Sequence, residues 1–461
     1  MIWNLERPAK PALPNSYFWT WDHSTNWMLD DPGMLNFGCA NKYLKRPETF
    51  VEDYHRLTDL AAGLGVKGIL IWGFIRDSHG GIEYSKRVAD YAASKNIAIM
   101  PGIGTTWYGG IYYEGDHPYN IETFTRNNPD ACTVDEKGEK SGHGACPTNP
   151  KFLDWLQESI QWLFREFAIG GANLENGDFM VCHDPGCKAQ KASWPETDPD
   201  FFRLQALSYE PALRAIEGQL KDKIVTYATY TGFLPGTDPQ KISHRFMNCE
   251  RPAMFDRLPK DGICQFTITE MVHFDQIPLT AFLDNGAPPE VFDNPRWPND
   301  VKPPSVRTAG FLHQASQWNW ITRYNQAVSA IKEGCLKAYR TGLEGVSIHG
   351  EVSSMYIPWA LNYLAFSHFI HWPEDTLRDF GRKTMGQVLG SEDEGEAFAE
   401  LLAHWDAGTL TEQHRKDLHD RRWPLRRTIC ASADDLERWR FWDWLDRVAS
   451  GPAEIQTASF F

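Results

Sequence analysis

Carboxylate side chains follow several short apolar runs of this sequence, at the point where each run ends. Glu175 ends the run 170–174, and Asp178 stands just beyond it. The same pattern recurs at Glu270 and at Glu351. Runs this short that follow amphipathic segments are typical of buried strands. Carboxyl groups at the ends of such strands can divide general acid and general base roles when their surroundings differ.

Aromatic and basic side chains follow the other predicted strands and form candidate walls for a substrate site. Tryptophan suits sugar rings, whose apolar faces stack on indoles, and the chain has 19 tryptophans. For the tryptophans a packing role is the alternative, and for the histidines a structural hydrogen bond. The candidate substrate-binding residues are Trp72, Arg76, His79, Trp107, Tyr108, His143 and His349.

The elements that must position these residues follow a regular alternation. Short apolar runs alternate with amphipathic segments, which is typical of a parallel sheet with crossover helices. This pattern and the polar strand ends predict a (β/α)8 TIM barrel, whose sites lie at the carboxyl ends of its strands. The segment 102–150 shows no helix or strand pattern, so we predict a long lid or subsite wall there. The predicted strands are 17–22, 68–73, 97–100, 170–174, 224–230, 262–269, 308–313 and 345–349.

The last part of the chain is predicted to be helical. We expect an α/β barrel over residues 1–372 and a helical extension packed on it over residues 373–461, because no change of composition marks a linker. The predicted helices of this part are 359–369, 375–389, 392–407 and 434–448.

Composition limits the class of partner and the compartment. The formal net charge of -15 argues against nucleic acid or an anionic membrane surface as partner. The chain shows neither an export signal nor an apolar run long enough for a membrane span. Its nine cysteines are scattered without a framework spacing, which favours reduced thiols and a cytoplasmic location. The oligomeric state is left open.

The sequence predicts neither a cofactor nor a metal. It contains no Gly-x-Ser-x-Gly elbow, P-loop or dinucleotide fingerprint. A structural zinc site built from Cys182, His183 and Cys187, with His143 and Cys146 from another loop, is the alternative. The absence of any Cys-x-x-Cys or His-x-His pair weighs against it.

Several stretches resemble bacterial barrel proteins related to α-glucuronidases, β-hexosaminidases and endo-β-N-acetylglucosaminidases. They are 176–178 with the cysteine pair after it, 345–351, and 371–373 with the helix 377–390. The segment 101–120 is similar to uncharacterised bacterial proteins of the same group. The resemblance implies a glycoside hydrolase-like barrel with a carboxylate acting from the end of the fourth strand. That position falls on Glu175, with Asp178 as the competing choice; the adjacent Asp-Glu pair of hexosaminidases is absent.

Cleavage of a glycosidic bond needs one protonated carboxyl group and one ionised carboxylate. We therefore expect a bacterial glycoside hydrolase of polysaccharide degradation, with Glu175 as acid, Glu351 as base or nucleophile and Glu270 in reserve. Strands four and eight lie across the barrel mouth from each other, so a Glu175–Glu351 pair favours inversion of the anomeric centre. A non-catalytic carbohydrate-binding barrel protein is the alternative function.

Overall fold

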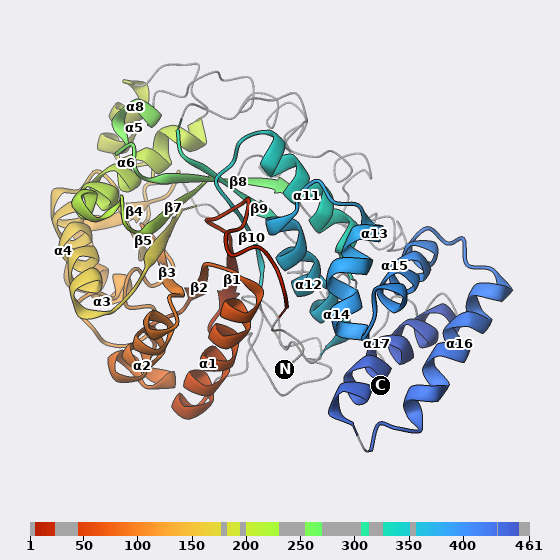
Figure 1. Cartoon of the computed structure of the whole chain (residues 1–461). Helices are drawn as coiled ribbons and strands as arrows, with labels where there is room; N and C mark the ends of the chain where they lie inside the picture. Colours follow the sequence, from red (N-terminus) through yellow and green to blue (C-terminus); the bar gives the residue numbers. More distant parts are fainter. Residues whose placement is uncertain are drawn as a thin grey trace.

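The structure is a computed structural model that describes residues 5–23, 45–176, 182–193, 200–229, 254–269, 306–312, 326–350, 356–430 and 432–450. Eight parallel strands close into a barrel in the order β1, β10, β9, β8, β7, β6, β3, β2 (Figure 1). Each of the eight predicted runs forms one of these strands, which confirms the (β/α)8 prediction. The barrel strands are β1 (Tyr17–Trp21), β2 (Gly68–Trp72), β3 (Ala98–Gly104), β6 (Gly171–Glu175), β7 (Ile224–Thr229), β8 (Ile263–Thr269), β9 (Thr308–Leu312) and β10 (Val346–His349).

Both faces of the barrel strands are buried, which explains why their sequences read as continuous apolar runs. In β2, Leu70 and Trp72 belong to the cluster that fills the barrel, whereas Ile69 and Ile71 belong to the cluster between the strands and the helices. Alternate residues of one strand therefore face the interior and the helical layer. This alternation decides which strand-end side chains reach the barrel mouth.

Helices follow the strands and cover the outside of the barrel (Figure 1). Their starts carry ordinary signals: the Asn149 side chain accepts hydrogen bonds from the first backbone amides of α4, and Pro150 occupies its first position. The helices of the barrel layer and its connections are α1 (Pro47–Leu64), α2 (Gly81–Ser94), α4 (Pro150–Glu166), α5 (Pro185–Ala192), α6 (Asp200–Arg214), α8 (Met254–Arg257), α11 (Val328–Arg340) and α12 (Ile357–His371).

The segment after β3 has more regular structure than predicted. Strand β3 continues through Pro101 to Gly104, and the segment then forms the helix α3 (Ile121–Asn127) and the antiparallel hairpin of β4 (Cys132–Val134) and β5 (Lys140–Ala145). The prediction of an irregular segment was wrong. Helix α3 is too short to show an apolar period, and β5 is glycine-rich and mostly exposed, so it lacks apolar alternation.

Helix α12 joins the barrel to the C-terminal helices. All of its residues are buried, and one continuous hydrophobic cluster includes Trp359 of α12 together with Phe398 and Trp442 of the later helices. The predicted domain boundary falls just beyond this helix and stays a prediction. The C-terminal elements are α13 (Leu377–Phe380), a π-helical turn (Gly381–Met385), α14 (Gly386–Leu389), α15 (Glu392–Asp406), α16 (Glu412–Arg426) and α17 (Ala433–Ser450). Within the described residues, no helix has the length and apolar character needed to cross a membrane.

Candidate functional site

Three tryptophans pack together in the barrel interior. Trp19 and Trp21 of β1 contact each other and Trp72 of β2, with ring centroids 5.6 to 6.4 Å apart. A side chain at Gly102 of β3 would place its Cβ 2.5 Å from the Trp72 indole, so glycine is needed for this packing. Trp72 is 1% exposed and contacts the Tyr108 ring at 5.3 Å. Trp72 therefore supports Tyr108 from below.

Glu175 lies at the carboxyl end of β6. It is 3% exposed, and it shares the inward face of the strand with Asn173, two positions earlier. Its backbone carbonyl accepts a hydrogen bond from the Thr105 amide at 3.1 Å, which joins the end of β6 to the end of β3. Burial, and then the charge of Glu175, raise the pKa of the Tyr209 hydroxyl well above its usual value. A carboxyl group thus stands inside the mouth next to a buried tyrosine.

A chain of amides and hydroxyls crosses the barrel interior one layer below Glu175. The Asn173 amide donates to Thr226 Oγ1 at 2.8 Å and to Gln265 Oε1 at 2.9 Å. The Gln265 amide in turn donates to Ser347 Oγ at 3.1 Å. These contacts link β6, β7, β8 and β10. These hydrogen bonds orient the Asn173 and Gln265 side chains in the layer below Glu175.

His349 ends β10 on the inward face. It is 1% exposed, and its ring lies 5.2 Å from the Trp19 ring and 5.4 Å from the Phe311 ring. Burial lowers the pKa of His349 to about 3. The imidazole is therefore neutral at neutral pH and can exchange hydrogen bonds without adding charge to the mouth.

The buried His349 makes stability depend on pH. The unfolded chain binds a proton at this histidine below pH 6.5, whereas the folded chain binds it only near pH 3, so stability falls as the pH drops between these values. We expect wild type to lose about 1 kcal/mol per pH unit more than His349→Gln between pH 6 and pH 4. Urea unfolding of both proteins at several pH values measures this. If the unfolding free energies of the two proteins change with pH in parallel, His349 does not have the lowered pKa.

A second cluster of charged residues surrounds Asp22, directly after β1. The Asp22 carboxylate is 1% exposed and lies 2.7 Å from Arg76 Nε, 2.8 Å from His23 Nδ1 and 3.2 Å from His79 Nε2. Burial alone would raise the pKa of Asp22, but the hydrogen bonds of His23 and His79 and the Arg76 charge hold it well below its usual range. Gly73 has φ +78°, and a Cβ there would lie 2.4 Å from Asp22. The loop after β2 therefore closes tightly over this carboxylate.

The cluster extends outward to the wall of a cavity. Arg76 also donates to Glu114 at 2.6 Å, and its guanidinium lies 4.3 Å from the centre of the Tyr113 ring. His79 stacks on Phe50 at 3.8 Å and directs Nε2 at both Asp22 and the Gly73 carbonyl, so Nε2 carries the proton. Asp22 and its partners thus hold Arg76 in place, and Arg76 presents its outer edge to the cavity.

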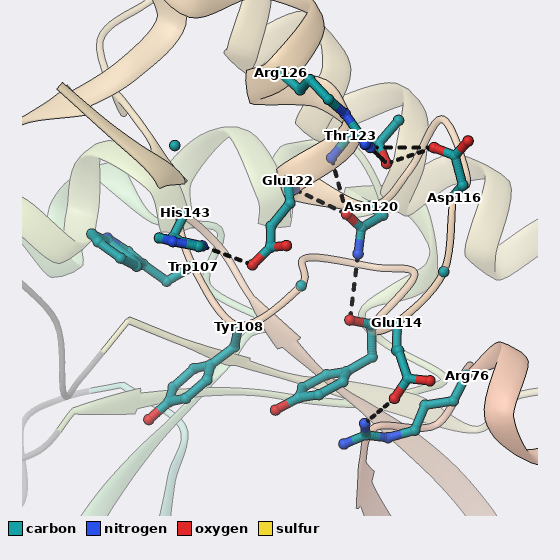
Figure 2. A pocket seen from close by; sticks show the side chains of 14 residues that line it. Arg76, Trp107, Tyr108, Glu114, Asp116, Asn120, Glu122, Thr123, Arg126 and His143 are labelled. Atoms are coloured by element: carbon teal, nitrogen blue, oxygen red, sulfur yellow. Dashed lines mark hydrogen bonds and ion pairs between the residues drawn. The ribbon is translucent and has the colours of Figure 1, made fainter.

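The cavity has a volume of about 780 Å³ and is built mainly by the segment between β3 and α4. Figure 2 shows Trp107 and His143 on one side of it, Arg76 and Glu114 on the other, and Glu122 between them. The His143 ring lies 2.9 Å from Glu122, and Arg126 lies near Asp116. The lining residues are Arg76, Trp107, Tyr108, Gly109, Tyr113, Glu114, Gly115, Asp116, Asn120, Glu122, Thr123, Arg126, Gly142 and His143.

Tyr108 adopts a strained backbone conformation in this wall. Its φ of 54° lies in the left-handed region, and Gly109 and Gly110 after it have φ of 72° and 74°. For a residue with an aromatic side chain this conformation costs about 1–2 kcal/mol. A Cβ at Gly104 would lie 2.0 Å from the Trp107 carbonyl, so glycine there lets the turn approach the end of β3. Strain of this kind often accompanies sites that must present a side chain in one orientation.

The structure separates the predicted site residues into three groups. Arg76, Trp107, Tyr108 and His143 line the cavity. Glu175, Trp72 and His349 lie in the barrel interior, and His79 lies behind Arg76 against Asp22. The predicted residues Asp178, Glu270 and Glu351 lie outside the described residues.

Sequence reasoning did not select four residues that this site uses. Asp22 follows β1 just as Glu175 ends β6, so the strand-end pattern could have identified it. Tyr113, Glu114 and Glu122 lie in the segment without a clear apolar period, where the sequence carries no signal for their orientation.

Comparisons with known proteins add similar folds at low identity. No family model matches the chain, and no curated protein matches it in sequence. Among solved structures it is similar to a maltogenic α-amylase from Thermotoga neapolitana, at 10% identity over 77% of this chain and 76% of that chain (TM-score 0.42).

Two further similar structures are glycosidases by their names. A β-N-acetylhexosaminidase from Bacteroides fragilis matches at 12% identity over 82% of this chain and 70% of that chain (TM-score 0.39). The α-L-fucosidase isoenzyme 2 from Paenibacillus thiaminolyticus matches at 13% identity over 78% of this chain and 50% of that chain (TM-score 0.41). At these TM-scores the likeness carries no argument about activity, and the fold assignment rests on the strand pairing.

Proposed function

We propose that this chain is a glycoside hydrolase that cleaves a glycosidic bond in an oligo- or polysaccharide, with Glu175 as the general acid. One observation carries the proposal: Glu175 is a buried carboxyl group on the inward face of a barrel strand, at its carboxyl end. Catalytic groups of TIM-barrel enzymes occupy such positions. The acid role needs the protonated form at the working pH.

The cavity supports a carbohydrate as the substrate. Trp107 and Tyr108 supply aromatic surface, on which the apolar face of a sugar ring can stack. Glu114, Glu122 and Arg76 supply charged acceptors and donors for hydroxyl groups. Tyr108 follows the end of β3, which pairs with the end of β6 at Gly104 and Glu175. A sugar bound against Tyr108 would therefore lie close to the strand ends that carry the acid.

The second carboxylate of the reaction is assigned from the sequence alone. We propose Glu351 as base or nucleophile, with Glu270 and Asp178 as alternatives. A water between acid and base requires carboxyl groups about 6.5–9.5 Å apart and inverts the anomeric centre, whereas direct attack requires about 5–5.5 Å. Opposite strands favour the wider spacing, so we propose inversion.

One observation favours a non-catalytic carbohydrate-binding protein as the second candidate. The described carboxylates of the cavity wall are paired: Glu114 with Arg76, Glu122 with His143, and Asp116 with Arg126. Paired carboxylates suit the binding of hydroxyl groups and need no proton transfer. The two candidates share the sugar site and differ in turnover.

A panel of chromogenic aryl glycosides tests the proposed function. We expect wild type to hydrolyse at least one of them, and Tyr108→Ala to raise KM about tenfold through the loss of ring stacking, about 1.4 kcal/mol. Proton NMR of the first-formed product should show the inverted anomer. Saturable binding of sugars by wild type without hydrolysis would contradict the hydrolase and support the binding protein.

A further inference from the structure

Three cysteine side chains gather beside the cavity wall, outside the barrel interior. Cys146 directly follows β5, Cys182 precedes α5, and Cys187 lies in the first turn of α5. Their exposed fractions are 4%, 5% and 0%, and they form a buried cluster of their own. The three Sγ atoms all lie within 4.8 Å of one another, and those of Cys146 and Cys187 are 3.6 Å apart. We call these residues the cysteine trio.

Polar groups surround the sulfur atoms. The Thr148 hydroxyl lies 3.3 Å from Cys146 Sγ and 3.2 Å from Cys187 Sγ. The Val134 backbone amide donates to Cys182 Sγ at 3.4 Å. Donors of this kind stabilise negative charge on sulfur and orient sulfur ligands around metal ions. Three thiols packed as ordinary small apolar side chains would not need them.

The spacing of the trio fits a metal ion better than a disulfide. Zinc binds thiolates at about 2.3 Å in tetrahedral geometry, which places neighbouring sulfur atoms about 3.8 Å apart. The separations in the trio include 3.6 Å and extend to no more than 4.8 Å. A disulfide needs about 2.05 Å between two sulfur atoms and would leave the third thiol unused.

We propose that Cys146, Cys182 and Cys187 bind one thiophilic divalent cation, Zn²⁺, as a structural site. The three thiolates occupy three of the four tetrahedral positions, and water completes the set. This inference takes up the structural zinc site that the sequence analysis gave as the alternative, without His143 and His183, which do not belong to the cluster of three thiols. The Cys-x-x-Cys spacing that usually marks such sites is absent because the ligands come from two separate connections.

The ion would brace the loops that shape the cavity. Strand β5 carries His143 in the cavity wall and leads directly to Cys146. Cys182 belongs to the connection that begins at Glu175, the last residue of β6, and ends at α5. One ion therefore ties the cavity wall to the chain that leaves the strand end of Glu175. This role does not depend on the reaction that the site performs.

Metal content of the full chain tests the proposal. Protein purified without a metal-chelating tag, under reducing conditions, is loaded with ZnSO₄, dialysed and analysed by mass spectrometry of the metals. We expect about one zinc per chain. Cys146→Ser and Cys187→Ser should each lower the content at least about tenfold, because removal of one thiolate dismantles the site. The matched controls are Cys335→Ser, a buried thiol on α11, and Cys430→Ser, an exposed one; both should keep the zinc.

Cobalt substitution in wild type keeps the test independent of the folding of the variants. Co²⁺ bound by the trio should give thiolate charge-transfer absorption together with strong visible bands of tetrahedral geometry, and EDTA should remove both. Zinc at background level in the loaded wild type, or a Cys187→Ser variant with wild-type zinc content, would overturn the proposal. The mass of the intact protein is also measured before and after reduction. A mass lower by two hydrogens before reduction, with peptide mapping that locates the bond at Cys146 and Cys187, would overturn the proposal in favour of a disulfide.

Discussion

Replacement of Glu175 by glutamine is expected to lower the turnover of an unactivated glycoside by roughly 10²- to 10⁴-fold, the usual loss when general acid help is removed. Glutamine keeps the size of the side chain, so the packing at the end of β6 should persist. Circular dichroism and urea unfolding check that the fold is kept. Initial rates on the natural linkage and on aryl glycosides measure the effect.

The leaving group shows whether the lost function is that of an acid. An aryl glycoside with a good leaving group needs little protonation, so Glu175→Gln should reduce its cleavage far less. Glu122→Gln is the control, because Glu122 lies in the cavity wall and is 60% exposed. If Glu175→Gln lowers turnover equally on substrates with good and poor leaving groups, Glu175 is not the general acid. If Glu122→Gln lowers turnover more than Glu175→Gln does, the catalytic carboxyl group lies in the cavity wall.

Replacement of Arg76 by methionine is expected to destabilise the fold by about 3–5 kcal/mol, the usual cost when one partner of a buried ion pair is removed. Asp22 is 1% exposed and the Arg76 side chain 12%, so water cannot take over the lost charge. Urea unfolding at neutral pH measures the change. Arg126→Met is the matched control on the same cavity wall: its side chain is 65% exposed, and its pair with Asp116 should contribute less than about 1 kcal/mol.

A second substitution and a change of pH identify the cause of the loss. If an uncompensated Asp22 charge is responsible, Asp22→Asn should recover part of the stability of Arg76→Met. The pKa of Asp22 is lowered in the folded wild type, so its contribution is present above the unfolded value of 3.8 and is lost as the pH falls below it. Without Arg76 the Asp22 carboxyl takes up a proton at a higher pH. The difference in unfolding free energy between wild type and Arg76→Met should therefore become smaller as the pH falls. A difference that does not change with pH would indicate that lost packing is the cause.

The sequence predicted the barrel well because its strands are buried on both faces. Such strands read as short apolar runs between amphipathic helices, and β2 was predicted at 68–73 and found at 68–72.

The segment 102–150 was predicted poorly because its elements have no regular apolar pattern. Its stability comes from caps and tertiary contacts, such as the Asn120 side chain at the start of α3, and these leave no periodic signal. Helix α16 escaped prediction because it is polar around most of its surface and contains Pro424.

The candidate site was predictable in part. Arg76, Trp107, Tyr108 and His143 were selected by residue type and line the cavity. The position of Glu175 follows from the end of β6, whereas Asp22 and Arg76 meet because β1 and β2 pair Trp21 with Trp72 and the loop after β2 folds back. Strand register is a tertiary property that one sequence does not display. The cysteine trio shows the same limit, since its members come from two connections that only the folded barrel brings together.

Helix α12 has a consequence for how this protein can be modified in evolution or by design. Every residue of α12 is buried, because the helix packs against the barrel on one side and against the C-terminal helices on the other. A gene rearrangement that removed or exchanged the region after residue 372 would leave an apolar helix without its cover. The C-terminal helices share an apolar face with the barrel through α12, so substitutions on either side of that face affect the packing of both.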